Sequence, residues 1–116
     1  MKTITISVRV HIKQSDIESL LCSVATGSSY WASGVGELGY ESTVKGLING
    51  SQVVKIKDYE DGEKGYTLDI KGVKRGLTIM AKKQPDHFAD LLKDNADNNT
   101  SDVFLQCALL GDVLYG

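Results

Sequence analysis

The 116-residue sequence has one proline, one tryptophan, two cysteines and little excess charge, with 13 basic against 15 acidic residues. A net charge of −2 argues against an electrostatic nucleic-acid binder, which carries a clearly basic face, and it is too small for a mimic of DNA. Cys22 and Cys107 do not have the spacing of zinc ligands, and two cysteines are too few for a disulfide framework. We therefore expect two reduced, buried cysteines in a cytoplasmic protein.

Long apolar runs are also absent, so the sequence predicts neither a signal peptide nor a membrane span. Its length suggests one domain, residues 1–116, and 41% apolar residues suffice for a core. The chain has no P-loop, G-x-S-x-G, H-E-x-x-H or C-x-x-C motif, and no metal-ligating pattern surrounds His11 or His87. An enzyme is the least supported class, and we expect no catalytic residue, no metal and no cofactor.

Hydrophobic periodicity predicts the elements of the first half. Residues 3–12 alternate between apolar and polar side chains, which predicts a half-buried strand. Ser15 and Glu18 match a capping box, and apolar residues then follow at helical spacing, so a helix is expected to end near Gly27. Residues 27–41 are rich in glycine and serine, which indicates a loop.

A hairpin is expected in the middle of the chain. Val54 and Ile56 mark a strand, Asp61-Gly62 is a strong turn signal, and Tyr66 begins the return strand. The next segment, residues 69–83, fits a helix better than a weakly alternating strand. Two glycines in that segment, Gly72 and Gly76, each cost a helix about 1 kcal/mol, and their spacing of four suggests the close approach of another backbone.

Residues 101–110 are apolar on nearly every side, which predicts a buried helix. Either this helix is the centre of the core, or part of it meets a second subunit. The apolar tail after Gly111 is expected to dock on the body, and a short helix is expected at 87–93. Residues 42–50 are ambiguous, since their apolar spacing suits a short helix but Gly46 and Gly50 weaken it. The sequence therefore predicts an α+β fold, a small antiparallel sheet of about three or four strands with helices packed on one face.

Two loop motifs suggest binding sites. Residues 34–39 spell G-x-G-x-x-G, but no hydrophobic strand runs into the first glycine, so a flexible loop is expected there and not a dinucleotide turn. Tyr30 and Trp31 offer flat rings that could stack a base, and neighbouring hydroxyls and glycine N–H groups could hold phosphate or sugar. Alternatively, Trp31 fills the core where the loop crosses it. The candidate ligand-binding residues are Ser28, Ser29, Tyr30, Trp31 and Tyr115.

Three short motifs carry a resemblance to a known family. Ser29-Tyr30-Trp31-Ala32 stands where that family often has Asn-Tyr-Trp-Cys, Ala108-Leu109-Leu110-Gly111 where it has Ala-Leu-Phe-Gly, and Tyr115-Gly116 where it closes on Tyr-Gly. On these residues the chain resembles a family of small proteins of bacteriophages and prophages of gut bacteria. The alanine at position 32 argues against a catalytic thiol.

The resemblance implies a non-catalytic counter-defence protein in the cytoplasm of the host. It would sequester a small nucleotide-like immune signal, in a pocket that in such proteins is often built between the subunits of a homodimer or higher homo-oligomer. The alternative is an inhibitor that binds a host defence protein, in the manner of an anti-CRISPR, through the acidic turn 58–63 or the acidic segment 86–102. No membrane or nucleic acid is expected as a partner.

Overall fold

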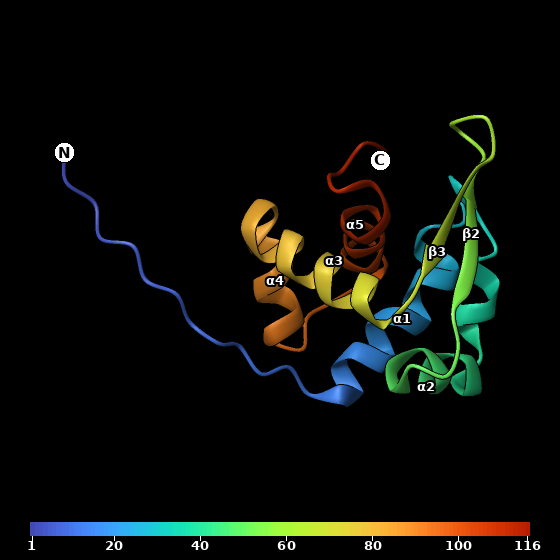
Figure 1. The fold of residues 1–116 in the computed structure, drawn as a ribbon, viewed down its shortest axis with the longest axis horizontal. Helices are drawn as coiled ribbons and strands as arrows, with labels where there is room; N and C mark the ends of the chain where they lie inside the picture. Colours follow the sequence, from blue (N-terminus) through green and yellow to red (C-terminus); the bar gives the residue numbers. More distant parts are fainter.

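Helices alternate with a small sheet along the chain, and the computed structural model describes all of residues 1–116. In Figure 1 an extended arm projects from one end of the body and the sheet stands at the other. The elements in chain order are α1 (Gln14–Gly27), β1 (Ala32–Ser33), the 3-10 helix η1 (Val35–Gly39), α2 (Glu41–Asn49), β2 (Val54–Asp58), β3 (Lys64–Leu68), α3 (Ile70–Lys83), α4 (Pro85–Leu92) and α5 (Asn98–Leu110). None of the helices has the length and apolar character that a membrane crossing requires.

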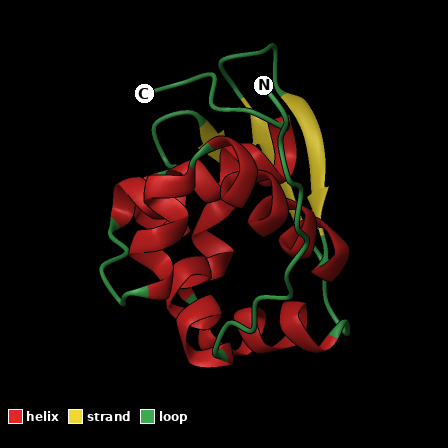
Figure 2. Cartoon of the chain, turned by 90° about the vertical axis from the view of Figure 1, so that its left-hand side faces the viewer, coloured by secondary structure: helices red, strands yellow, loops and turns green.

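The three strands form one antiparallel sheet in the order β1-β2-β3. Val54, Ile56 and Leu68 point into the core, whereas Lys55 and Lys57 lie on the opposite, exposed face. Helices therefore cover a single face of the sheet, and Figure 2 shows most of the helical structure on one side of the strands. This arrangement confirms the predicted α+β fold with a small antiparallel sheet.

Helix α5 is the centre of the core. All its residues from Val103 to Ala108 are buried by their own chain, so this helix is the core element and no second subunit is needed to cover it. It crosses α3 at Gly76, where an added Cβ would lie 2.6 Å from the Cβ of Ala108. The predicted helix over 69–83 and the predicted close approach at one of its glycines are both confirmed. Gly72 instead faces the Asp69 side chain that caps α3.

The predicted strand over residues 3–12 is wrong. These residues pair with no strand and form the extended arm, in which Ile4 is 93% exposed and Ile6 is 77% exposed. Only Ile12, at the root of the arm, packs against the core. A period of two specifies an extended backbone with one apolar face, but it does not specify which strand lies beside it.

Two further local predictions need correction. Helix α1 starts at Gln14 after Lys13, and the proposed capping box makes no side-chain cap hydrogen bond. The segment 27–41 contains β1 and η1 and is not a continuous loop. Gly34, the first glycine of the G-x-G-x-x-G match, has φ of 89°, and a Cβ there would lie 2.4 Å from the carbonyl oxygen of Lys55. This glycine therefore serves the contact between the η1 segment and β2.

The two cysteines differ in environment. Cys107 is buried in α5, and burial raises the pKa of its thiol to about 11. Cys22 is exposed on α1, so the prediction that both cysteines are buried is wrong for this one. Both thiols are free.

Candidate functional site

A buried carboxylate, Asp102 on α5, is the centre of a hydrogen-bonded group that we call the Asp102 cluster. Its Oδ1 accepts hydrogen bonds from Ser28 Oγ at 2.8 Å and from Trp31 Nε1 at 2.7 Å. Its Oδ2 accepts from the Tyr30 hydroxyl at 2.5 Å and from Gln106 Nε2 at 3.0 Å. The cluster joins the α1–β1 turn to the core helix across more than 70 residues of sequence.

Local structure on both sides produces this convergence. The backbone N–H groups of Trp31 and Ala32 both donate to the Ser28 carbonyl, which closes a tight turn after α1. Asp102 and Gln106 are four residues apart on α5, so their side chains share one face of the helix. A buried carboxylate is costly without partners, and here four donors satisfy it. Indeed, every buried side-chain nitrogen or oxygen in the chain has a hydrogen-bond partner.

Gln106 extends the cluster to the C-terminal tail. Its Oε1 accepts from the backbone N–H groups of Leu114 at 2.8 Å and Tyr115 at 2.9 Å, and its Nε2 donates to the Tyr115 carbonyl at 3.1 Å. The Tyr115 ring lies 5.4 Å from that of Trp31. The tail therefore docks on the body, as the sequence predicted.

The Tyr115 hydroxyl binds a second buried carboxylate, donating to Asp58 Oδ2 at 2.8 Å. The other oxygen of Asp58 accepts from the Glu60 N–H at 3.0 Å. Asp58 is only 1% exposed, so it does not belong to the surface of the acidic turn with which the sequence grouped it. The same correction holds for Asp102, which is 5% exposed and was expected within the acidic surface segment 86–102.

The two carboxylates keep the tyrosine hydroxyls protonated. Burial, followed by the hydrogen bond to Asp102, raises the pKa of Tyr30 well above its usual range. The hydrogen bond to Asp58 raises the pKa of Tyr115 to about 12. Both phenols are therefore neutral donors at physiological pH, and they hold the rings in place.

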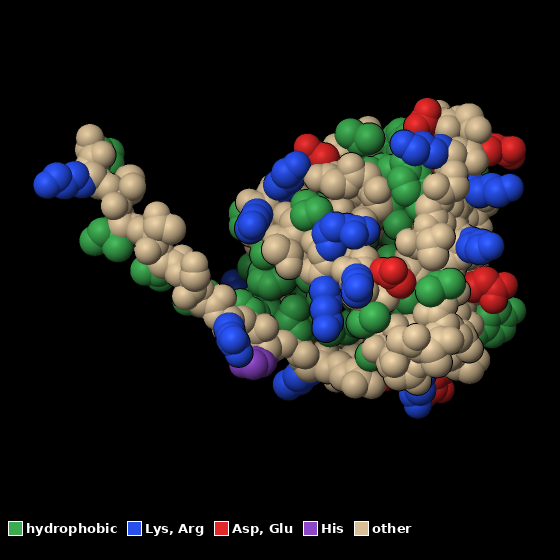
Figure 3. All heavy atoms as spheres, viewed as in Figure 1, with side chains coloured by type: hydrophobic (Ala, Val, Ile, Leu, Met, Phe, Trp, Pro, Cys, Tyr) green, Lys and Arg blue, Asp and Glu red, His purple; other side chains and the backbone are tan.

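The rings of these tyrosines reach the surface. Tyr30 is 46% exposed, Tyr59 is 43% exposed, and Tyr115 is half-buried. The Tyr59 hydroxyl donates to the backbone carbonyl of Ser29, which places this ring beside the α1–β1 turn. We call Tyr30, Tyr59 and Tyr115 the tyrosine face. It adjoins the exposed acidic turn of Glu60, Asp61 and Glu63 at the end of the β2–β3 hairpin, where Figure 3 shows acidic side chains.

The five residues predicted to bind a ligand do come together, but they point in different directions. Ser28 and Trp31 are fully buried and face Asp102, so Trp31 presents no ring face to a ligand in this structure. Ser29 is exposed and donates its hydroxyl to the Thr26 carbonyl. Tyr30 and Tyr115 each present part of a ring. Ligand binding by these residues stays a prediction.

Four residues of the site were missed: Asp58, Tyr59, Asp102 and Gln106. For two of them the sequence held a signal. Asp102 and Gln106 are polar residues spaced four apart in an otherwise apolar helix, and buried polar side chains require partners. Those partners had to come from a distant segment rich in hydroxyl and N–H donors. Nothing local marks Asp58 as different from the acidic residues after it.

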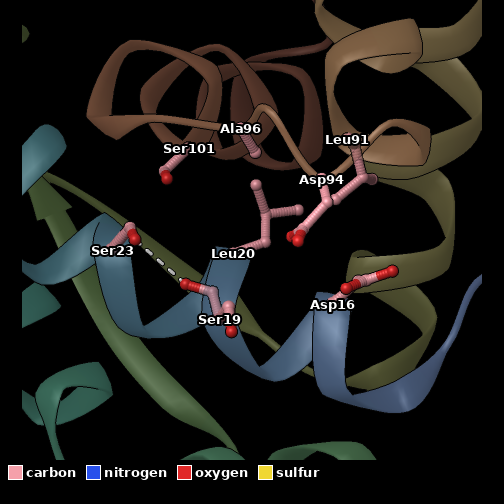
Figure 4. Close-up of a pocket in the computed structure, with 8 residues that line it drawn as sticks. All are labelled: Asp16, Ser19, Leu20, Ser23, Leu91, Asp94, Ala96 and Ser101. Carbon is pink, nitrogen blue, oxygen red and sulfur yellow. Dashed lines mark hydrogen bonds between the residues drawn. The ribbon is translucent and has the colours of Figure 1, made fainter.

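Three hollows indent the molecule, and none is lined by the tyrosine face. The smallest, about 50 Å³, lies between α1, α5 and the loop that joins α4 to α5 (Figure 4). Ser23 donates its hydroxyl to the Ser19 carbonyl at its edge, and the carboxylates of Asp16 and Asp94 flank it. This space suits a few water molecules, since drug-sized ligands occupy roughly 300–1,000 Å³. A second hollow, about 250 Å³, lies between α1, α2 and η1.

Elsewhere in the chain, no three His, Cys, Asp or Glu side chains are grouped so that they could hold a metal ion. His87 is half-buried, with Nδ1 lying 3.3 Å from the Thr100 hydroxyl oxygen. Comparison with protein-family models, curated proteins and solved structures finds no match to this chain. The resemblance to small phage proteins therefore stays a prediction.

Proposed function

We propose that this chain is a non-catalytic binding protein that recognises a protein partner through the tyrosine face and the adjoining acidic turn. One observation carries the proposal: three partly exposed tyrosine rings, each held by its hydroxyl, lie beside three exposed carboxylates. Tyrosine is enriched in protein interfaces because its ring buries a large area at a small cost in conformational entropy.

The hydroxyl contacts reduce that cost further. Tyr30 is held by Asp102, Tyr59 by the Ser29 carbonyl, and Tyr115 by Asp58. Immobilising a free side chain on binding costs about 0.5–1.5 kcal/mol. Because these rings are already fixed, a partner that packs on them avoids most of this cost. The face is therefore organised before the partner arrives.

The acidic turn specifies the charge of the partner. Glu60, Asp61 and Glu63 are exposed, and the neighbouring Lys64 places its ammonium group 5.5 Å from the centre of the Tyr66 ring. The three carboxylates make the turn itself negative, which favours a partner with a basic patch. In the setting that the phage resemblance implies, a defence effector that binds nucleic acid would supply such a patch.

The test compares three baits in a pull-down from host lysate, followed by binding measurements with the purified prey. The first bait is the natural chain, and the second carries Glu60→Lys, Asp61→Lys and Glu63→Lys. The third carries a three-charge reversal in the other acidic segment, Asp86→Lys, Asp90→Lys and Asp94→Lys, and keeps Asp97, whose side chain caps α5 by accepting from the Thr100 N–H. Asp58 stays unchanged because it is buried and holds Tyr115.

We expect one prey protein to bind the first and third baits and to be absent from the second. The same prey should be lost with Tyr59→Ala, a change that leaves the charge unaltered. Retention of the prey by the second bait would refute the acidic turn as the recognition surface. Loss of the prey only from the third bait would move the surface to segment 86–102.

A small nucleotide-like ligand is the second candidate, because Tyr30 and Tyr59 present partly exposed rings and the Tyr59 hydroxyl reaches the backbone of the residue before Tyr30. A base could stack on either ring, as aromatic side chains do for single-stranded nucleic acids. The test is a thermal-shift titration with cyclic nucleotides and cyclic ADP-ribose isomers, since a ligand that binds only the folded state stabilises it. Stabilisation that disappears in Tyr30→Ala supports this candidate. No shift at ligand concentrations far above micromolar rejects it.

A further inference from the structure

The arm, residues 1–12, has the sequence of a strand but no neighbour. Its apolar side chains become more exposed toward the tip, from 48% at Val10 and 74% at Val8 to 93% at Ile4. No hydrogen bond within the chain involves any of its residues. Isoleucine and valine favour strands because their branched side chains pack well on a pleated, half-buried surface. The arm therefore presents one apolar face and a row of free backbone donors and acceptors.

The body offers an apolar groove at the root of this arm. Leu77 and Ala81 of α3 and Phe88 of α4 line it together with the arm residues Val8, Val10 and Ile12, and its volume is about 300 Å³. In Figure 3 hydrophobic side chains gather where the arm leaves the body. The root of the arm thus already lies over the groove, while its tip extends beyond the body.

We propose that two copies of this chain pair their arms as an antiparallel two-stranded ribbon about a twofold axis, with Val8 opposite Val8 of the second copy. Each tip then lies over the groove of the other copy. Ile6 faces Val10 and Ile4 faces Ile12 across the ribbon. This exchange pairs the backbone groups on the facing edge of each arm and covers the exposed apolar side chains in one step.

The sequence of the arm selects this register. It is the only one in which all five apolar residues face one another: Ile4, Ile6, Val8, Val10 and Ile12. It also places Arg9 opposite Ser7 and His11 opposite Thr5 on the polar face. A shift by two residues in one direction sets Arg9 against Arg9, and like charges directly opposite destabilise a strand pair. A shift in the other direction sets Lys2 against Ile12.

A second copy fits this surface for two reasons. A twofold interface uses the same patch on both partners, and here one chain carries both the arm and the groove that receives it. An isolated two-stranded ribbon is only marginally stable, but this one packs on α3 and α4 of both copies. Stable interfaces use about 20–30 residues from each partner, a number that one arm plus one groove approaches. The inference does not rest on the proposed function, because the tyrosine face belongs to other segments.

The test uses the full chain and light scattering coupled to size exclusion. The natural chain should elute with the mass of two chains, against 12.6 kDa for one. Ile6→Lys with Val8→Lys should raise the dissociation constant at least about a hundredfold, because the symmetric dimer loses each apolar contact twice and burying one such side chain contributes about a factor of ten or more. The control, Thr5→Glu with Ser7→Glu, adds as many charges to the polar face, where they lie opposite His11 and Arg9 of the second copy, and it should remain dimeric.

Cross-linking tests the register. In a Cys22→Ser background, Val8→Cys should form a disulfide-linked dimer under mild oxidation, because the two residues face each other. Thr3→Cys should not, since the two residues at position 3 lie about 34 Å apart along the ribbon. Circular dichroism of each variant should match that of the natural chain, because the arm makes few contacts within one copy.

Three results would overturn the inference. The first is a natural chain that remains monomeric up to hundreds of micromolar. The second is a dimer that survives Ile6→Lys with Val8→Lys, since the interface would then lie elsewhere. The third is a dimer that depends on the arm yet forms no cross-link at position 8, which would place the arm on another part of the second copy.

Discussion

Replacing Asp102 by alanine is expected to destabilise the protein by about 2–6 kcal/mol. Ser28, Trp31 and Gln106 are each fully buried, and each donates to this carboxylate. A buried donor left without a partner costs about 1–3 kcal/mol. Ser28 Oγ and Trp31 Nε1 have no other acceptor, so two such donors give about 2–6 kcal/mol. Gln106 Nε2 keeps the Tyr115 carbonyl and the Tyr30 hydroxyl within reach. The loss is a large part of the roughly 5–15 kcal/mol that stabilises a small domain.

Asp102→Asn should lower the free energy of unfolding by less, about 1–3 kcal/mol, because asparagine keeps one of the two acceptor oxygens. The amide oxygen can still accept from Ser28 and Trp31, which share Oδ1. The amide nitrogen replaces Oδ2, so the Tyr30 hydroxyl must rotate to accept. Gln106 cannot reverse its own amide, because its Oε1 already accepts from two backbone N–H groups. Gln106 is therefore the only fully buried donor that loses its Asp102 acceptor, since Tyr30 is 46% exposed and its hydroxyl proton can turn to water.

Urea unfolding followed by both Trp31 fluorescence and circular dichroism measures these differences. Asp61→Ala is the control, because Asp61 is exposed at the hairpin turn and its unfolding free energy should change by less than about 0.5 kcal/mol. The reasoning fails if Asp102→Ala lies within about 1 kcal/mol of the natural chain, or if Asp102→Asn is the more damaging change.

Three further predictions concern α3, the C-terminal tail and the cysteines. Gly76→Ala should destabilise the protein by about 1–2 kcal/mol in urea unfolding despite the better helix propensity of alanine, because the new methyl group would lie 2.6 Å from the Cβ and 2.9 Å from the Cα of Ala108; a variant as stable as the natural chain would contradict the close contact. The pKa of Tyr115 is about 10 in the unfolded chain and about 12 in the folded one, so its stabilising contribution is complete below pH 10 and is lost as the pH rises toward 12. The melting temperature of Tyr115→Phe should therefore fall less steeply between pH 10 and pH 12 than that of the natural chain. Equal slopes would count against the Asp58 contact. A thiol reagent should label Cys22 in the native protein and Cys107 only after unfolding, because Cys107 is buried and Cys22 is exposed. Peptide mass spectrometry identifies the labelled residue, and labelling of Cys107 in the native protein would contradict its burial.

Hydrophobic periodicity predicted an element correctly where other segments of the same chain cover that element. The buried helix α5, the β2–β3 hairpin and the helix over 69–83 follow from apolar spacing and turn residues, and all three are present. The arm has an equally regular pattern but no strand beside it in one copy of the chain. A local pattern fixes the conformation that a segment favours, whereas pairing depends on surfaces far away in sequence.

The site was predictable only in part, for the same reason. The run from Ser28 to Trp31 was recognisable because aromatic and hydroxyl residues are unusual together in a glycine-rich segment. Its orientation was not, because it depends on Asp102, more than 70 residues away. A tryptophan beside a tyrosine can face a ligand or the core, and the buried carboxylate decides that Trp31 faces the core.

The Asp102 cluster also constrains how the chain folds as it leaves the ribosome. Its donors at Ser28 and Trp31 are synthesised more than 70 residues before their acceptor, and the segment that Gln106 holds follows later still. Until α5 emerges, the indole and the hydroxyl have only water to bind, and the hairpin has no helix to cover its inner face. Folding of these residues during translation must therefore wait for α5, and a stalled chain that ends before Asp102 would expose the surfaces that α5 normally covers.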